Sequence, residues 1–248
     1  MCKTVLLVPV FIIFHIHIHA QAVFISKGKI EYEKKVNMHK FIEDNSWTRE
    51  IKDRMPVYNT SYHDLFFDSS QSLFKAGREV PDNKWKNFWG ANLNEENQLF
   101  MNFSDGMSTE FKQVFEKKFI IQDTAIKVEW RITDEIRTIA GFDCRKAVGR
   151  MFDSLYVVAF FTDQITVPVG PGPYHGLPGA ILGLAFPRYY TTWFATKVEL
   201  VSPKADELKA PAGKASKIDR KELMTMVKEA NRWGSEEEKQ KNFWSMVL

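Results

Sequence analysis

The feature that most restricts the fold of this chain is a short alternation of apolar and polar residues that recurs along most of its length. Residues 126–133 read IKVEWRIT, with Ile126, Val128, Trp130 and Ile132 on one side. A period of two is typical of a β-strand with one buried and one solvent-facing side. Because no long helical pattern separates such runs, the sequence predicts an antiparallel meander. The other runs are residues 29–36, 64–67, 98–103, 107–115 and 118–122.

Turn signals and apolar runs farther along the chain indicate the same fold class. Asp105 and Gly106 separate two alternating runs, and a glycine that tolerates positive φ at this place is typical of a tight hairpin. Two more strands are expected around Gly141, and residues 154–162, SLYVVAFFT, are apolar enough for a central strand. We therefore predict a mainly β fold: a curved antiparallel, half-barrel-like sheet with one or two C-terminal α-helices.

The C-terminal part of the chain carries the helix signals. Residues 219–222, DRKE, and 235–238, SEEE, each place a capping side chain three residues before a glutamate, as a capping box requires. They predict helices over 219–232 and 235–246, the first with an apolar stripe that packs on the sheet. Together with the polar, turn-rich residues before them, these helices form an expected C-terminal unit of linker and helices, 202–248.

The first 22 residues have the pattern of a secretory signal peptide. Lys3 precedes an apolar stretch, residues 5–14, that is too short to cross a membrane, and small residues over Ala20–Ala22 offer a cleavage site. We therefore expect residues 1–22 to be removed. The mature chain is expected to be periplasmic or secreted, without a transmembrane segment, and to fold as an antiparallel β domain over 23–201.

The charge balance gives no sign of a polyanionic partner. The chain has 34 basic and 31 acidic residues, a net charge of +3, and cleavage of the leader removes Lys3 alone. The two signs are interspersed, so the composition predicts neither nucleic acid nor an anionic membrane as a partner. After cleavage a single cysteine, Cys144, is left, which we expect to be a small buried residue without a disulfide.

Residues 166–184, TVPVGPGPYHGLPGAILGL, form the most unusual stretch of the chain. A phosphate-binding loop would enter a helix and carry a lysine, whereas this stretch enters a strand-like run without one. A flexible linker is also unsuitable, because prolines at 168, 171, 173 and 178 restrict φ there and bias the preceding residues toward extended conformations. We predict a rigid, shaped connection between two core strands that displays Tyr174 and His175.

The same stretch resembles a known family. GPYHGLPGAILGL is similar to the signature of the GLPGLI family of exported proteins from Gram-negative bacteria, and IAGFDCRKAVGR is similar to an upstream segment of that family. VVAFFTDQITVPVGP and KGKIEYEKK fit the intervening and first strands, so the resemblance runs in order over residues 27–201. Ala180 departs from the signature, which has leucine there. The resemblance implies a β-rich envelope protein, periplasmic or associated with the outer membrane, whose function is uncharacterised.

We expect a non-enzymatic binding or assembly protein, with an outer-membrane protein or a hydrophobic ligand as its partner and with no cofactor. A concave apolar sheet face covered by helices would hold such a ligand. A third hypothesis is a structural envelope component that acts through its C-terminal helices. The expected contact residues lie in the Pro/Gly loop and in the aromatic segment 82–92; they are Tyr174, His175, Gly176, Leu177, Pro178, Gly179, Trp85 and Trp89.

The alternative is an enzyme that uses a thiol and an imidazole. Cys144 and His175 are candidates for the nucleophile and the base, with Asp143 or Asp163 orienting the histidine. The structural interpretation competes with this hypothesis, because a lone cysteine in a strand is usually a packing residue.

Two further hypotheses are a protein that handles metal ions and a protein that carries a covalent modification. His39 and His63, with Met38 and Asp64 beside them, are the metal candidates, but no HExxH, CxxC or HxH motif is present after residue 22. Thr124 in DTA and Ser154 in DSL fit a short acceptor motif for O-glycosylation that occurs by chance in many sequences.

Overall fold

The structure is a computed structural model that describes residues 24–81, 96–114, 116–151, 155–232 and 234–247. The expected signal peptide, the aromatic residues Trp85 and Trp89, and the modification candidate Ser154 lie outside the described residues. None of the described helices combines the length and the apolar character that a membrane span requires.

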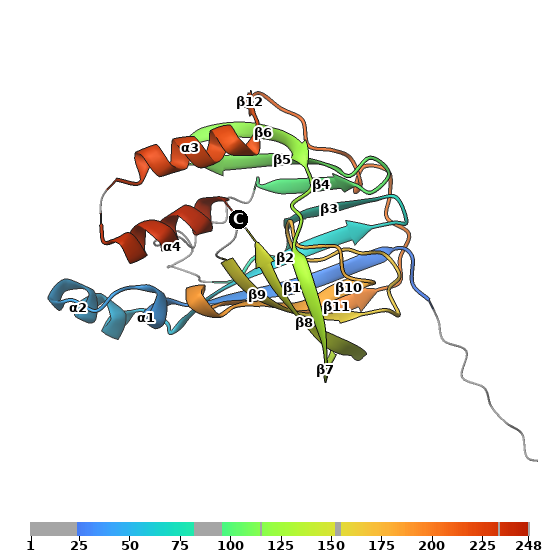
Figure 1. Ribbon diagram of the computed structural model, residues 1–248, viewed down its shortest axis with the longest axis horizontal. Coiled ribbons are helices and arrows are strands. Elements are labelled where there is room, and N and C mark those ends of the chain that lie inside the picture. The colour runs from blue at the N-terminus through green and yellow to red at the C-terminus, as the bar shows by residue number, and fades with distance from the viewer. Residues whose placement is uncertain (1–23, 82–95, 115, 152–154, 233, 248) are drawn as a thin grey trace, which may run out of the picture.

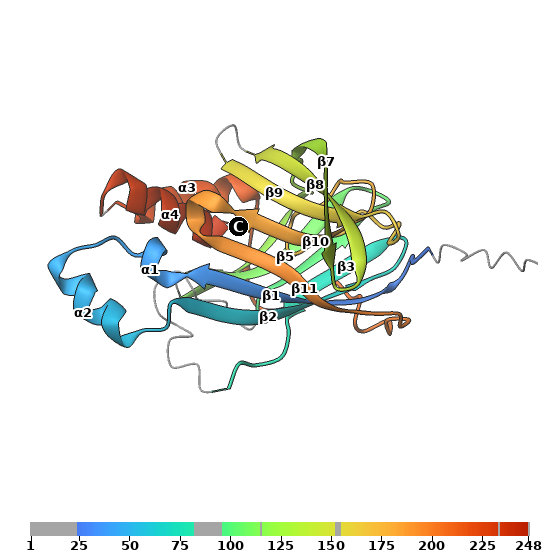
Figure 2. The same cartoon turned by 90° about the horizontal axis from the view of Figure 1, so that it is seen from below.

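The described strands join into one curled sheet, which confirms the predicted mainly β fold (Figures 1 and 2). Neighbouring strands pair antiparallel throughout, except that β12 pairs parallel with β6. The sheet order is β12-β6-β5-β4-β3-β2-β1-β11-β10-β9-β8-β7. The strands are β1 (Gly28–Asn37), β2 (Tyr58–Phe67), β3 (Gln71–Ala76), β4 (Gln98–Asn102), β5 (Met107–Val114), β6 (Lys117–Thr124), β7 (Glu129–Ile139), β8 (Phe142–Met151), β9 (Leu155–Thr162), β10 (Ala180–Phe186), β11 (Thr191–Glu199) and β12 (Ser216–Ile218).

The first strand holds the sheet together. β1 pairs with β2 on one side and with β11 on the other, so it joins the meander β1 to β6 with the meander β7 to β11. Because a curled sheet encloses its inner face, the main core lies inside the curl. Tyr32, Phe67 and Phe161 are among its largest fully buried side chains.

Both predicted hairpin turns are confirmed, with residues in the left-handed region. Gly106 has φ +68° between β4 and β5, and Gly141 has φ +85° between β7 and β8. Ala140 also has positive φ, +50°, so the second turn has the two left-handed positions of a type I′ hairpin.

The strand predicted over 126–133 differs from expectation in where it begins and in how far one of its apolar side chains is buried. It begins only at Glu129, as β7, and its side chain at Ile132 is 41% exposed instead of buried. β7 is the last strand of the sheet, and its pairing with β8 shifts between Ile132 and Ile136. An edge strand is covered on fewer sides than a central one, so the alternation there does not lead to burial.

The predicted C-terminal helices are confirmed as α3 (Arg220–Ala230) and α4 (Glu236–Val247). Asp219 and Glu222 form the reciprocal capping box, and Ser235 and Glu238 form a second one. Leu223 of α3 is buried in the main core, and both helices lie at the same end of the curl (Figures 1 and 2). The stretch predicted as a linker ends in a strand, β12, which extends the sheet beside β6.

Three short helices were not predicted: α1 (Met38–Phe41), α2 (Ser46–Arg54) and the 3-10 turn η1 (Pro187–Tyr189). The side chain of Asn37 accepts a hydrogen bond from the Lys40 amide and caps α1. Met38 and Ile42 pack into a small separate cluster beneath α1. These helices are too short for a clear apolar period in the sequence.

Candidate functional site

A lysine and a set of aromatic rings meet on the inner face of the sheet where β1, β2 and β11 are paired. Lys34 lies opposite Trp193 of β11 and Ser61 of β2 in the strand register. Its Nζ lies 4.8 Å from the ring centroid of Trp193, a cation–π distance. The lysine is half-buried, although it stands on one of the central strands of the sheet.

His63 on β2 lies within the same group of side chains. Its ring stacks on Phe74 at a centroid distance of 5.2 Å and an interplanar angle of 4°, and it lies 4.8 Å from Trp193. Ser61 Oγ lies 3.3 Å from His63 Nε2. Burial, with a smaller contribution from the charge of Lys34, lowers the pKa of His63 to about 3. The imidazole is therefore neutral at pH 7.

Two charged residues of β5 complete the group. Lys112 and Glu110 lie on the buried side of β5 and form an ion pair of 3.1 Å. The curl carries β5 around toward β1 (Figure 1), and the charge of Lys112 adds to burial in lowering the pKa of Lys34 to about 8. We refer to Lys34, His63, Phe74, Glu110, Lys112 and Trp193 as the inner cluster.

The inner cluster has a net positive charge at neutral pH. Lys34 and Lys112 carry positive charge, Glu110 carries negative charge, and His63 is neutral. Its groups are suited to hold an anion beside apolar rings.

Sequence reasoning missed the inner cluster except for His63. A signal was present: in β1 the inward residues are Ile30, Tyr32, Lys34 and Val36, so a lysine interrupts an apolar series. Long cationic side chains are almost never placed on a buried face without a partner. A search for residues that break the alternation would have found Lys34, but not its neighbours on β5 and β11.

Cys144 has the environment of a packing residue, as predicted. Its side chain is fully buried, and its thiol contacts the carbonyl of Phe142 at 3.5 Å. Burial is the main cause that raises the pKa of Cys144 to about 12, with the charge of Asp143 acting in the same direction. A catalytic thiol needs a lowered pKa and access to substrate, and Cys144 has neither.

His175 does not lie in the arrangement that a catalytic base needs. Its ring is hydrogen-bonded to the backbone of Ile126, and its buried Nε2 has no hydrogen-bond partner among the residues that the structure describes. Burial lowers the pKa of His175. Its own carbonyl accepts a hydrogen bond of 2.9 Å from Trp130 Nε1. The orienting candidate Asp143 instead accepts a hydrogen bond from Thr138, and Asp163 is exposed.

The thiol of folded protein is therefore expected to resist modification. Incubation with 5,5′-dithiobis(2-nitrobenzoic acid) at pH 8 should release no thiolate dye over an hour, because both burial and the raised pKa suppress the reactive form of Cys144. The same protein in 6 M guanidinium should react with one equivalent per chain once residues 1–22 are absent. Rapid reaction of folded protein would restore the thiol–imidazole hypothesis.

The Pro/Gly loop connects adjacent strands, β9 and β10, and is built of tight turns. The Val169 amide donates to the Val167 carbonyl and the Gly179 amide to the Leu177 carbonyl, both at 2.8 Å. This agrees with the prediction of a shaped connection between core strands.

The expected display of Tyr174 on that loop is wrong. Tyr174 is 3% exposed and packs on Phe186, and Leu177 is 2% exposed, because the loop folds back as part of the core. Gly179 is buried as well, His175 is half-buried, and of the six predicted contact residues in the loop only Gly176 and Pro178 are exposed. Burial and the charge of Glu110 raise the pKa of Tyr174, which links the loop to the inner cluster.

The predicted metal ligands are not brought together. His39 Nε2 lies 3.2 Å from the Met55 carbonyl, His63 belongs to the inner cluster, and Asp64 pairs with Lys29 at 2.9 Å. Within the described part of the chain, no three His, Cys, Asp or Glu side chains are grouped in a way that could hold a metal ion. Thr124, a modification candidate, is exposed at the end of β6.

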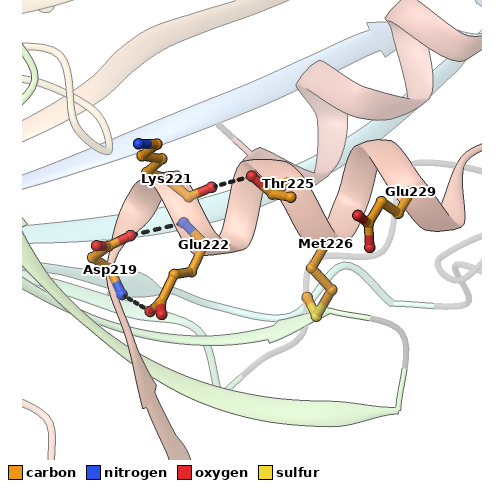
Figure 3. Close-up of a pocket in the computed structure, with 6 residues that line it drawn as sticks. All are labelled: Asp219, Lys221, Glu222, Thr225, Met226 and Glu229. Atoms are coloured by element: carbon orange, nitrogen blue, oxygen red, sulfur yellow. Dashed lines mark hydrogen bonds between the residues drawn. The ribbon is translucent and has the colours of Figure 1, made fainter.

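A shallow pocket lies along α3 (Figure 3). Its carboxylates at Asp219 and Glu222 are used in the capping box, and Thr225 donates to the carbonyl of Lys221 within the helix at 2.9 Å. Glu229 and Met226 complete the lining. Because most of these polar groups serve the helix itself, the pocket has no separate set of ligand-binding groups.

The comparisons with known proteins support the fold alone. The chain matches none of the family models and no curated protein. Among solved structures it is similar to PNGF-II in two crystal forms, C2 and P21, with TM-scores of 0.54 and 0.53 and identities of 16% and 17%. These matches cover 81% of this chain but only 32% and 33% of PNGF-II, so the chain spans about a third of that protein's length.

A further similarity is weaker. The Pseudomonas aeruginosa MucA/MucB complex matches with a TM-score of 0.39 and 9% identity, over 77% of this chain and 57% of the matched chain. At these levels of identity, the matches to PNGF-II show a similarity of fold alone. They assign no activity.

Proposed function

We propose that this protein is an exported, non-enzymatic binding protein of the cell envelope that carries an apolar ligand on the inner face of its curled sheet. Membership of the GLPGLI family and a periplasmic location are parts of the same proposal, based on the sequence motifs and the leader. The observation that carries the binding role is the inner cluster, where aromatic rings and charged groups face one another inside the curl.

Partial exposure within the inner cluster supports this function. Phe74 and Lys34 stand on strands in the middle of the sheet, yet both side chains are only half-buried. A sheet whose inner face is closed by its own packing would bury such residues. Aromatic and apolar surface that faces inward and keeps contact with solvent is typical of a ligand-binding face.

Binding of a neutral fluorescent dye, N-phenyl-1-naphthylamine, tests the proposal. We expect saturable binding in the micromolar range, and a loss of affinity of about fivefold or more in Phe74→Ala because a half-buried ring of the inner cluster is removed. Phe111→Ala is the matched control, because Phe111 lies on β5 with its side chain on the opposite side from Glu110 and Lys112.

Two results would contradict the proposal. One is the absence of saturable dye binding by the folded protein. The other is an equal loss of affinity in Phe74→Ala and Phe111→Ala, which would place the dye elsewhere on the molecule. Circular dichroism of each variant shows whether the fold is retained.

A further inference from the structure

We propose that the ligand of the inner cluster is a single-chain amphiphile with one negative charge on its head group, such as a fatty carboxylate, held by Lys34 beside Lys112. This inference rests on the proposed function and specifies the chemistry of the same site.

The charged groups of the inner cluster are unequally paired. Lys112 has Glu110 at 3.1 Å, whereas Lys34 forms no ion pair with any residue that the structure describes. Its nearest ring partner is Trp193, at a distance suited to a cation–π contact. A half-buried ammonium group without a carboxylate loses hydration that a ring face replaces only in part.

The state of Lys34 agrees with this imbalance. Burial and the charge of Lys112 both lower its pKa, to about 8. An anion placed between the two lysines would reverse the second effect and offset the first. Among the described residues, Lys112 with its partner Glu110, the imidazole of His63 and the phenol of Tyr32 are titratable groups on this face, and His63 is neutral.

The charges of the inner cluster favour a ligand with one negative charge. Among the described residues of the cluster, two lysines and one glutamate leave a single positive charge, which one negative charge neutralises. A head group with two negative charges would leave an excess negative charge beside Glu110. A cationic head group would be repelled by both lysines. The cluster therefore favours a monoanion over a dianion, a neutral group or a cation.

Apolar side chains lie next to the charged groups of the inner cluster. Phe74 and Trp193 lie 5.7 Å apart, and Tyr32 lies 6.4 Å from Phe74, so aromatic rings adjoin Lys34 along the inner face. Beyond them the inner face continues with Ile30 and Leu65, which are buried in the main core. A charge next to an aromatic ring that is only half-buried, as Phe74 is, matches a molecule with an acidic head and a hydrocarbon tail.

Displacement of N-phenyl-1-naphthylamine by laurate, 1-dodecanol and dodecyl phosphate, each below its aggregation limit at pH 7, tests the inference. Laurate should bind about tenfold more tightly than 1-dodecanol, because a charge-assisted hydrogen bond to an ammonium group is stronger than a neutral one. Laurate should also bind more tightly than dodecyl phosphate. In Lys34→Gln the preference for laurate over 1-dodecanol should fall to within about twofold, and Lys34→Arg should keep most of it.

Lys35→Gln is the matched control. Lys35 is the next residue of β1, its side chain points to the opposite face, and it pairs with Glu33 at 2.6 Å. This variant should keep the full preference for laurate. The comparison of ligands in the unmodified protein needs no variant, so the test stands even where Lys34→Gln fails to fold.

The outcomes separate the two proposals. Equal affinities for laurate and 1-dodecanol would overturn the anionic head group and leave the binding function in place. Tighter binding of dodecyl phosphate would overturn the single charge. A preference for laurate that survives in Lys34→Gln would place the head group elsewhere. Failure of the dye and all three ligands to bind would overturn the proposed function itself.

Discussion

Gly179→Ala is expected to destabilise the protein by about 3–5 kcal/mol, as strain and overpacking act together. Gly179 has φ +136°, a conformation that residues with a side chain rarely adopt. A Cβ atom there would lie 2.0 Å from the Thr162 carbonyl oxygen and 3.0 Å from Asp163 Cα. Both are backbone atoms, so no rotamer change relieves the clash.

The clash falls where the Pro/Gly loop enters the sheet. Ala180, the next residue, pairs with Thr162 at the end of β9, so relief requires β9 and β10 to separate at that point. Those strands contribute some of the most completely buried residues, among them Ile181 and Phe161. The loss in free energy of unfolding therefore arises in the main core rather than at the surface.

Urea unfolding of Gly179→Ala and Gly176→Ala provides the measurement. Gly176 belongs to the same loop and also has positive φ, +91°, but the nearest atom to an added Cβ is Trp130 Nε1 at 4.0 Å. We expect Gly176→Ala to cost only about 1 kcal/mol, the price of the left-handed conformation. Similar losses in the two variants would show that the close approach to Thr162 does not restrict the loop.

His63 is expected to make the protein unstable in acid. The pKa of His63 is about 3 in the folded protein, below the ordinary value of 6.5 that applies to the unfolded chain. Above pH 6.5 both states are neutral at this residue, and it contributes no pH dependence. As the pH falls from 6.5 toward 3, the unfolded chain binds a proton that the folded protein does not, so stability is lost.

The slope of that loss approaches about 1.4 kcal/mol per pH unit. We expect His63→Phe to remove this part of the pH dependence between pH 6 and 4, because phenylalanine preserves the stacking on Phe74 and cannot be protonated. Ser61→Ala is the control that keeps the imidazole. Free energies of unfolding measured at pH 7, 6, 5 and 4 provide the test.

We expect the free energy of unfolding to fall less steeply with decreasing pH in His63→Phe than in the unmodified protein and in Ser61→Ala. Parallel profiles in all three proteins would mean that the imidazole is protonated in the folded state. That result would require water or a charge beside His63 that its contacts with Phe74 and Trp193 do not provide.

Some local features of the fold were predictable because they depend on residues close in the sequence. The two hairpin turns followed from glycines between alternating runs, and the helix starts followed from cap residues three positions before a glutamate. The burial of Cys144 followed from its residue type and strand context. Each of these signals spans a few residues, the range over which backbone preferences act.

The candidate site was not predictable to the same degree. His63 was identified for its residue type, as a candidate metal ligand only, whereas the structure places it in an aromatic stack. Tyr174 was predicted to be displayed, but the loop turns inward and buries it. His63 contacts Trp193, which lies on a strand far away in the sequence. Tyr174 packs on Phe186 of the next strand, and residue types alone do not set the direction in which the loop folds.

What the sequence determined by itself is the mainly β character, the hairpin turns, the stiff Pro/Gly loop and the capped C-terminal helices. What only the tertiary structure decided is which strands become neighbours, which strand lies at an edge and which face the curl encloses. Lys34 and Lys112 lie 78 positions apart, and only the curl brings β5 toward β1. The physical reason is that alternation sets the side on which a residue lies, whereas strand order and curvature arise from contacts among all the strands together.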